Sequence, residues 1–289
     1  LYDRIILAFG EGPHLPVPSL TIRHAPALFS THPKLLSFLG AKPTTLRQAY
    51  VALCRGWARI PAEPVSTLTI ANTEWTATQA RLLDAATVSD VLYPPLDLPE
   101  TIPARRRPFR LLALGRIAPN KRLEEAIEVL DRLRAEGLPA ELDICGHASG
   151  SYARRFAARY ASHPHVRLIL NANTEAKARA LSEATLGLHM FRGEHFGISI
   201  AEMIHAGIVP LVYDDGGVCE LVTTPDLRFT SANGATRIAA RLLTRPALIH
   251  DARHELQKGT ALARARQFPV ELDRVLDGFL CNEGTRHVA

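Results

Sequence analysis

The sequence of 289 residues contains no long apolar run and no paired cysteines, and only 6% of its residues are aromatic. No stretch approaches the roughly 18 consecutive apolar residues of a transmembrane helix. The opening LYDRIILAFG also lacks the basic segment and the long apolar segment of a secretory signal peptide. These absences predict a cytoplasmic protein without a membrane span.

Cysteine usage points to neither a metal site nor a disulfide framework. The four cysteines stand singly, with no CxxC pair and no histidine at zinc-finger spacing. The net charge of +5 would suit phosphate-bearing partners. No basic motif interleaved with aromatic residues suggests nucleic acid. We therefore expect a reducing compartment, no metal, no cofactor and no nucleic-acid partner.

The segment TIPARRRPFR divides the chain into two expected domains, 1–104 and 105–289. With 47% hydrophobic residues, the chain is long enough for two α/β cores. Two prolines and the cluster Arg105, Arg106 and Arg107 suit an exposed linker. The alternative role for this cluster is contact with anionic lipid headgroups at the inner face of a membrane.

Downstream of the expected linker, strand-like and helix-like segments alternate regularly. Such alternation predicts a parallel sheet built from βαβ units, with ligands at the carboxyl ends of the strands. In order, the segments are FRLLALG, EEAIEVLDRLRAEG, AELDICG, YARRFAARYA, VRLIL, EAKARALSEA, LGLHMF, ISIAEMIHAG and IVPLVY.

The upstream part is expected to form an α/β half-domain. Its strands are IILAF, STLTIAN and DVLYPP, a proline-rich loop follows the first of them, and helices are expected around Leu46 to Ile60 and Trp75 to Leu83. The chain opens on Leu1 rather than Met. We expect a fragment or a protein that has lost its start.

The segment FRGEHFGISIAEMIHAG carries two glutamates around a strand-to-helix turn. Gly197 allows close approach of a ligand, and the helix start favours phosphate. Glu194 and Glu202 could then bind hydroxyls on two parts of one ligand. The alternative is that both are solvent-exposed acids flanking a helix.

A second turn, in LLALGRIAPNKRLEEAIEVL, is rich in cations. Arg116, Lys121 and Arg122 follow a strand end, where cations can neutralise a diphosphate leaving group without a metal. The alternative is a solvated basic turn at the start of the next helix.

Together, the motifs GRxxxxKR, ExFGxxxxE and GGVCELV resemble the retaining GT-B glycosyltransferases, a large family that includes sucrose synthases, glycogen synthases and mannosyltransferases. The resemblance covers roughly Asn72 to Phe268. It implies two Rossmann-like domains facing a cleft, here with a shortened N-terminal domain. The closing RARQFPVELDRVL resembles the family's helix that crosses back to the N-terminal domain.

The resemblance also implies roles for individual residues. Arg116 and Lys121 would bind the donor diphosphate, Glu202 the ribose hydroxyls, and Glu194 sugar hydroxyls near the reacting carbon. The backbone at Phe196, Gly197, Ile198 and Ser199 would contact sugar and phosphate. His24, in TIRHAP, resembles the family's active-site histidine. The alternative for a lone histidine in a proline-rich loop is a surface or packing role.

The expected function is metal-independent transfer of a mannose- or glucose-like hexose from a nucleoside diphosphate sugar to a saccharide or lipid-linked acceptor, with retention of configuration. One alternative is a degenerate module that binds the nucleotide sugar without transferring it. Another is a nucleotide-sugar epimerase on the same fold.

Overall fold

The computed structural model describes residues 5–7, 19–24, 45, 49–50, 52–53, 68–84, 87–98 and 105–281. The chain forms two compact units. The first unit comprises Leu1–Leu96 together with Ala263–Ala289, and the second comprises Asp97–Leu262. The chain passes from the first unit to the second after Leu96, upstream of the boundary expected after residue 104. It returns to the first unit at Ala263.

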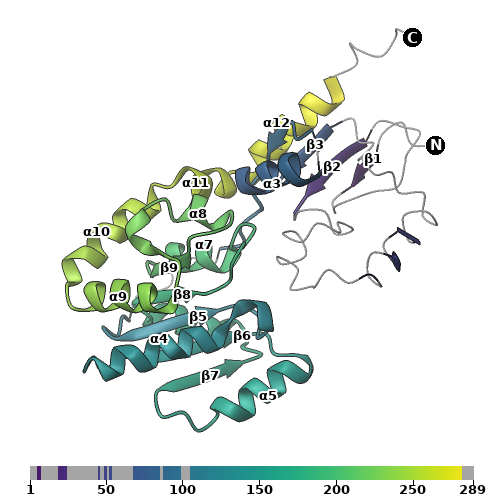
Figure 1. Ribbon diagram of the computed structural model, residues 1–289. Helices are drawn as coiled ribbons and strands as arrows, with labels where there is room; N and C mark the ends of the chain where they lie inside the picture. Colours follow the sequence, from purple (N-terminus) through teal and green to yellow (C-terminus); the bar gives the residue numbers. More distant parts are fainter. Residues whose placement is uncertain are drawn as a thin grey trace. The chain divides into compact units, whose positions relative to one another are not determined.

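The second unit is built on a parallel sheet of six strands. Their order is β10-β9-β8-β5-β6-β7 (Figure 1). Strand β5 is central and buries all five of its residues, as expected of a parallel strand covered on both faces. The strands are β5 (Arg110–Leu114), β6 (Glu141–Gly146), β7 (Val166–Leu170), β8 (Leu186–His189), β9 (Val209–Tyr213) and β10 (Arg228–Phe229).

Helices connect these strands where the alternating pattern predicted them. In α4 the buried side chains recur at the helical period, at Leu123, Ala126, Ile127 and Leu130. The helices of this unit are α4 (Leu123–Ala135), α5 (Gly150–Tyr160), α6 (Thr174–Glu183), α7 (Ile198–His205), α8 (Val218–Leu221), α9 (Ala232–Leu243) and α10 (Pro246–Gln257), with short 3-10 turns η1 (Pro119–Lys121) and η2 (Pro225–Leu227).

The strand order reverses at β5. From β5 the chain proceeds outward to β6 and β7, and then returns to place β8 on the other side of β5. Such a reversal is a topological switch point, where the loops at the carboxyl ends of the two central strands diverge and leave room for a ligand. The turns after β5 and β8 are the two that carry the predicted motifs.

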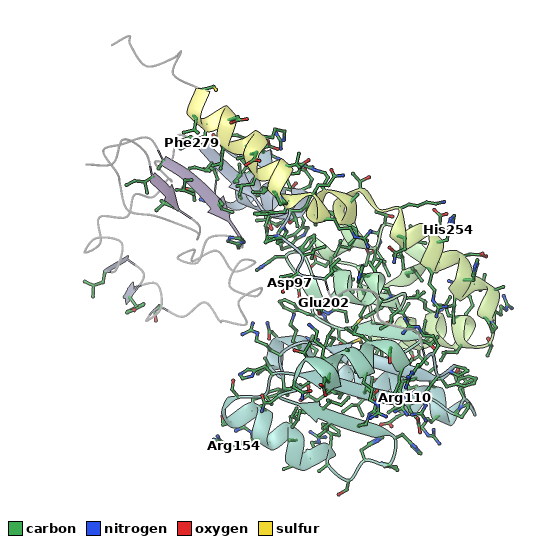
Figure 2. The ribbon with its side chains drawn as sticks, turned by 180° about the vertical axis from the view of Figure 1, so that it is seen from behind. Asp97, Arg110, Arg154, Glu202, His254 and Phe279 are labelled. Carbon is green, nitrogen blue, oxygen red and sulfur yellow. The ribbon has the colours of Figure 1, made fainter. Side chains whose placement is uncertain are left out.

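The first unit contains a second parallel sheet, of order β1-β2-β3-β4. Its core joins Leu20, Ile70 and Leu92 to Val275 and Phe279 of the last helix, α12 (Figure 2). The elements are β1 (Ile5–Leu7), β2 (Ser19–Arg23), β3 (Leu68–Ala71), β4 (Asp90–Val91), α3 (Glu74–Asp84) and α12 (Phe268–Cys281), and α11 (Thr260–Arg266) contains the divide between the units.

Strand β2 was not expected, because prolines precede it closely and its short run SLTIR was interpreted as part of a loop. The helix expected around Leu46 to Ile60 lies mostly outside the described residues. None of the described helices has both the length and the apolar character of a membrane span.

The expectation of a fully solvated arginine cluster is wrong for Arg106. Its Nη1 donates hydrogen bonds to the carbonyl oxygens of Leu181 and Ala184, each at 2.6 Å, and its Nη2 donates to that of Ala206. Burial lowers the pKa of Arg106 to about 10, with Arg253 contributing. The guanidinium thus satisfies carbonyls at the ends of α6 and α7, where the helix dipoles favour a cation.

Candidate functional site

A pocket of about 440 Å³ opens at the carboxyl ends of the strands of the second unit. It brings together four of the predicted donor-binding residues, Arg116, Ile198, Ser199 and Glu202. Arg116 comes from the turn after β5, and the other three come from α7, the helix that follows β8. The other lining residues are Leu114, Gly115, Cys145, Gly146, His147, Asn171, Ala172 and Lys177.

Two glycines bring the ends of β5 and β6 together beside this pocket. The Gly115 N–H donates to the Cys145 carbonyl at 3.0 Å. A Cβ on Gly146 would lie 1.7 Å from the carbonyl oxygen of Gly115, so no other residue fits there without moving the backbone. The pocket wall at this point is therefore bare backbone, as close approach of a ligand requires.

The turn into helix α7 supplies backbone donors. Gly197 has a φ of +94°, and a Cβ on it would lie 3.1 Å from Val218. The first intrahelical bonds of α7 begin at Ile200 N, so the N–H groups of Ile198 and Ser199 precede them. Phe196 is buried and packs beneath the turn. This arrangement suits a phosphate or sugar oxygen.

Glu194 accepts two hydrogen bonds and lies beside an imidazole. Its Oε2 accepts from Lys121 Nζ at 2.6 Å and lies 3.2 Å from Nε2 of the buried His189. Its Oε1 accepts the N–H of His195 at 3.2 Å. Burial alone would raise the pKa of Glu194, but His189 and Lys121 outweigh burial and lower it well below its usual range. Glu194 is therefore a fixed carboxylate rather than a proton donor.

The motif GGVCELV fixes the backbone of Glu194. Gly216 forms a parallel bridge with Glu194, and Val218 N–H donates to its carbonyl at 3.3 Å. A Cβ on Gly216 would lie 2.4 Å from the Glu194 carbonyl oxygen. Gly193 N–H also donates to Asp215 O at 3.2 Å. The third motif thus positions the second one.

Glu202, in α7, pairs with a residue that sequence reasoning missed. Lys177 Nζ, from α6, donates to Glu202 Oε1 at 2.5 Å, and both residues line the pocket. Glu202 is only 11% exposed, so the alternative of a solvated glutamate does not hold. No local pattern marks Lys177, because the contact depends on how two helices pack.

The remaining predicted residues lie elsewhere. Lys121 contacts Glu194 and lies 4.5 Å from the centre of the Phe191 ring, outside the residues lining the pocket. Arg122 pairs with Glu125 at the start of α4, so the second cation of the KR pair serves the helix. His24 follows β2 in the first unit, and its role stays a prediction.

Among the residues that the structure describes, no three His, Cys, Asp or Glu side chains gather in a way that could hold a metal ion.

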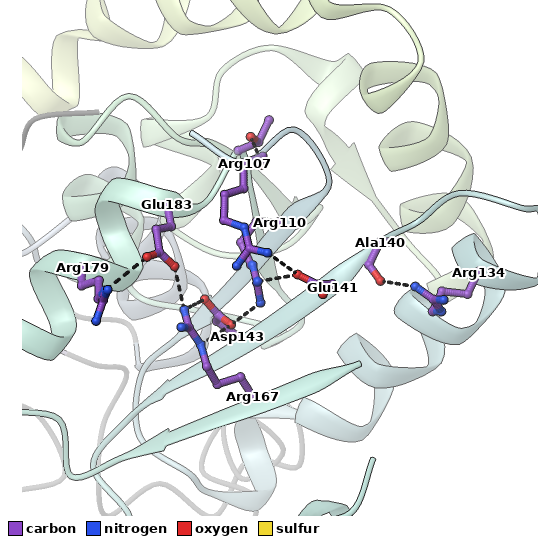
Figure 3. Close-up of polar contacts among 10 residues, drawn as sticks. Arg107, Arg110, Arg134, Ala140, Glu141, Asp143, Arg167, Arg179 and Glu183 are labelled. Atoms are coloured by element: carbon purple, nitrogen blue, oxygen red, sulfur yellow. Dashed lines mark hydrogen bonds and ion pairs between the residues drawn. The ribbon is translucent and has the colours of Figure 1, made fainter. Parts of the chain in front are cut away.

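A second charged cluster lies toward the amino ends of the strands (Figure 3). The fully buried Asp143 accepts from Arg110 Nη1 at 3.0 Å and from Arg167 Nε at 2.9 Å. Arg167 also donates to Glu183 at 3.0 Å, and Arg110 pairs with Glu141. Burial alone would raise the pKa of Glu183, but Arg167 lowers it overall. Sequence reasoning missed this cluster, although a charge inside the apolar run ELDICG marks it.

Curated and solved proteins resemble this chain. The human protein named GDP-Man:Man(3)GlcNAc(2)-PP-Dol alpha-1,2-mannosyltransferase is 25% identical over 171 residues, which cover 53% of this chain and 35% of that protein. Its Caenorhabditis elegans counterpart is 26% identical over 166 residues, which cover 50% of this chain and 35% of that protein. The chain thus spans about a third of the length of these relatives.

Solved structures agree on the fold. The crystal structure of WaaG, a glycosyltransferase involved in lipopolysaccharide biosynthesis, superposes with a TM-score of 0.65 and 15% identity, over 98% of this chain and 79% of that one. The structure of Anabaena Alr3699/HepE in complex with UDP and glucose gives 0.59 and 15%, over 91% and 72%. At 15% identity these two structures support the fold alone. They confirm the expected α/β fold of the GT-B type.

The family expected from the three motifs is confirmed by a direct match. Residues 98–247 match the sequence profile described as glycosyl transferases group 1, which covers more than half of the chain. The matched region contains both the pocket and the Glu194 turn. This chain belongs to the family glycosyl transferases group 1.

Proposed function

We propose that the chain transfers a hexose from a nucleoside diphosphate sugar to a saccharide or lipid-linked acceptor, with retention of configuration and without a metal. One observation carries the proposal. Arg116, Ser199 and Glu202 line a single pocket at the switch point of the sheet, and the fixed Glu194 carboxylate is held in the turn that leads into the same helix.

In this proposal Glu202 binds the ribose hydroxyls and Arg116 the diphosphate. Glu202 lines the pocket with a carboxylate that is 11% exposed, and a carboxylate accepts hydrogen bonds from a diol well. The N–H groups at Ile198 and Ser199 add donors for phosphate. Lys121 serves the leaving diphosphate, since a charge developing on phosphate in a site shielded from water is strongly stabilised by a cation.

Glu194 binds hydroxyls of the transferred sugar in this scheme. Among the described residues its Oε1 accepts one hydrogen bond, from the His195 N–H, and it can accept another from a sugar. His24 is the proposed active-site histidine by the same resemblance. The mannosyltransferase relatives carry GDP-Man in their names, so GDP-mannose is the first donor to test.

The test is a thermal-shift panel in EDTA with GDP, UDP, ADP and their mannose and glucose conjugates. A ligand at 100 times its Kd stabilises the native state by about 2.7 kcal/mol, which corresponds to a rise in Tm of roughly 5–10 °C for a protein of this size. We expect one base to be preferred. Arg116→Ala and Glu202→Ala should remove the shift, while Arg154→Ala, on the exposed outside of α5, should keep it.

Transfer assays separate the proposal from its alternatives. Turnover of the bound sugar nucleotide with an acceptor supports transfer. Nucleotide binding without turnover would identify a degenerate module, and a changed sugar without acceptor an epimerase. Absence of any shift across the panel would refute the assignment of the pocket.

A further inference from the structure

A second cavity, of about 390 Å³, lies in the second unit apart from the donor pocket. It is lined by residues from η2, from β10 with the two residues that follow it, and from α9 as far as Arg241 in its last turn. No residue lines both cavities. Nothing in the proposed transfer reaction uses it.

Three arginines and one acid line this cavity, and a second acid, Asp214, lies beside Arg228 just outside the lining. Arg228 Nη1 lies 3.2 Å from Asp214 Oδ1, and Arg241 Nη2 lies 3.2 Å from Oδ2 of Asp226, the acid in the lining. Arg237 has no ion pair or hydrogen bond with any residue in the described part of the chain. Its five N–H donors are available to a ligand.

Two of these arginines also carry unused buried donors. The Nε–H groups of Arg228 and Arg241 are buried and have no acceptor among the described residues. These nitrogen atoms are shielded from solvent, so a ligand in the cavity would be contacted by the terminal guanidinium nitrogens instead. A guanidinium group can donate two parallel hydrogen bonds to two oxygens of one phosphate.

The amino end of α9 adds to the positive electrostatic potential of this cavity. Ser231 Oγ accepts the Gly234 N–H at 3.1 Å, and Ala235 N–H donates to the Ser231 carbonyl. The N–H groups of Ala232 and Asn233 precede these bonds, and the helix dipole favours an anion at this end. Phe229, Ile238 and Pro225 contribute apolar surface to the same cavity.

We propose that this cavity, which we call the arginine cavity, binds a small organic phosphate monoester separately from the sugar-nucleotide donor. With Arg228 and Arg241 each paired to an acid, the unpaired charge of Arg237 attracts the charge of about −1.5 to −2 on such a phosphate at pH 7. The apolar wall and the volume accommodate the organic part of the ligand.

The test is calorimetric titration of the full chain at constant ionic strength with mannose 6-phosphate, inorganic phosphate and mannose. We expect mannose 6-phosphate to bind, inorganic phosphate to bind at least tenfold more weakly, and mannose not to bind. Arg237→Ala should weaken mannose 6-phosphate binding at least tenfold. Because Arg237 is exposed and makes no contact with described partners, this variant should keep the melting temperature of the wild type.

Two further variants locate the ligand. Arg154→Ala removes an exposed arginine elsewhere in the unit, and Arg116→Ala removes the cation of the donor pocket; both should retain mannose 6-phosphate affinity. Loss of binding in Arg116→Ala, unchanged binding in Arg237→Ala, or equal affinity for inorganic phosphate would each overturn the proposal. None of these results bears on nucleotide binding, so the proposed transfer function is judged independently.

Discussion

Both ends of the large sheet hold carboxylates that are largely shielded from solvent, but these carboxylates pair with different cations. Toward the amino ends, Asp143 accepts hydrogen bonds from two arginines and is fully buried (Figure 3). At the carboxyl ends, Glu194 and Glu202 each pair with a single lysine. The carboxylate far from the donor pocket is therefore paired with arginine, and the two beside the pocket are paired with lysine.

The difference follows from the chemistry of the cations. An arginine fork fixes a carboxylate through several directed hydrogen bonds. Lysine is a point charge on a flexible stem, and it can turn from a carboxylate toward an arriving phosphate. We infer that the Asp143 cluster stabilises the fold, whereas Lys121 and Lys177 hold their glutamates in place until a donor binds.

The largest effect is expected from Asp143→Asn. Removing this charge leaves Arg110 and Arg167 without their shared partner in a buried site, and we expect a loss of about 3–5 kcal/mol in the free energy of unfolding. Denaturant unfolding measures it. Glu128→Gln, which breaks only an exposed pair with Arg132, should cost no more than about 0.5 kcal/mol. Equal losses of unfolding free energy in both variants would contradict a stabilising role for the Asp143 cluster.

Glu194→Gln should impair sugar transfer strongly and stability only slightly, which is the reverse of what we expect for Asp143→Asn. We expect the rate of sugar transfer to fall about 10²–10³-fold, because a negative charge facing the transition state is lost. The free energy of unfolding should fall by only about 1–2 kcal/mol, since Gln still accepts a hydrogen bond from Lys121. Steady-state kinetics and unfolding of the same preparation test both halves. Unaltered transfer with a loss as large as that of Asp143→Asn would make Glu194 a purely structural residue.

Arg106 and Arg105 test whether an arginine outside the strands also stabilises the fold. Arg106→Gln should lower the free energy of unfolding by about 1–2 kcal/mol, because carbonyls at the ends of two helices lose their cation. The exposed Arg105 is the matched control, and Arg105→Gln should change the free energy of unfolding by less than about 0.5 kcal/mol. Neither change should alter nucleotide affinity. A large loss of that affinity in either variant would contradict a purely structural role for this segment.

The smallest effect concerns pH. Burial lowers the pKa of His189 below its usual 6.5, and the nearby Glu194 opposes this only in part. The unfolded chain then binds a proton that the native state does not, so stability falls as pH drops below 6.5. Between about pH 7.5 and 5.5, the free energy of unfolding should fall less in His189→Gln than in the wild type. Identical pH profiles for both would show that His189 binds its proton equally well in the native and unfolded states.

Much of the fold follows from local pattern, and the site follows only in part. Strands β5 to β9 were predictable because buried parallel strands are short apolar runs separated by amphipathic helices. The pairing of Asp143 with Arg167 was not, because it depends on register: β6 and β7 align these two residues as direct neighbours. A charge within an apolar strand indicates that a partner exists without identifying it.

The same reasoning explains what was missed around the glutamates. The motifs indicated Glu194 and Glu202, but His189 and Lys177 reach them only after strand β8 and helix α6 are packed. His189 did carry a signal, since it interrupts the apolar run LGLHMF. Lys177 carried none.

Strand β5 carries Arg110 at one end and leads into Arg116 at the other. Its five residues span roughly 16 Å, beyond the range of about 7–10 Å within which substitutions usually influence each other. Changes that alter donor choice around Arg116 should therefore combine additively with changes that strengthen the opposite edge. A variant library for new sugar specificity can be built on a stabilised background of this unit without re-optimising either set.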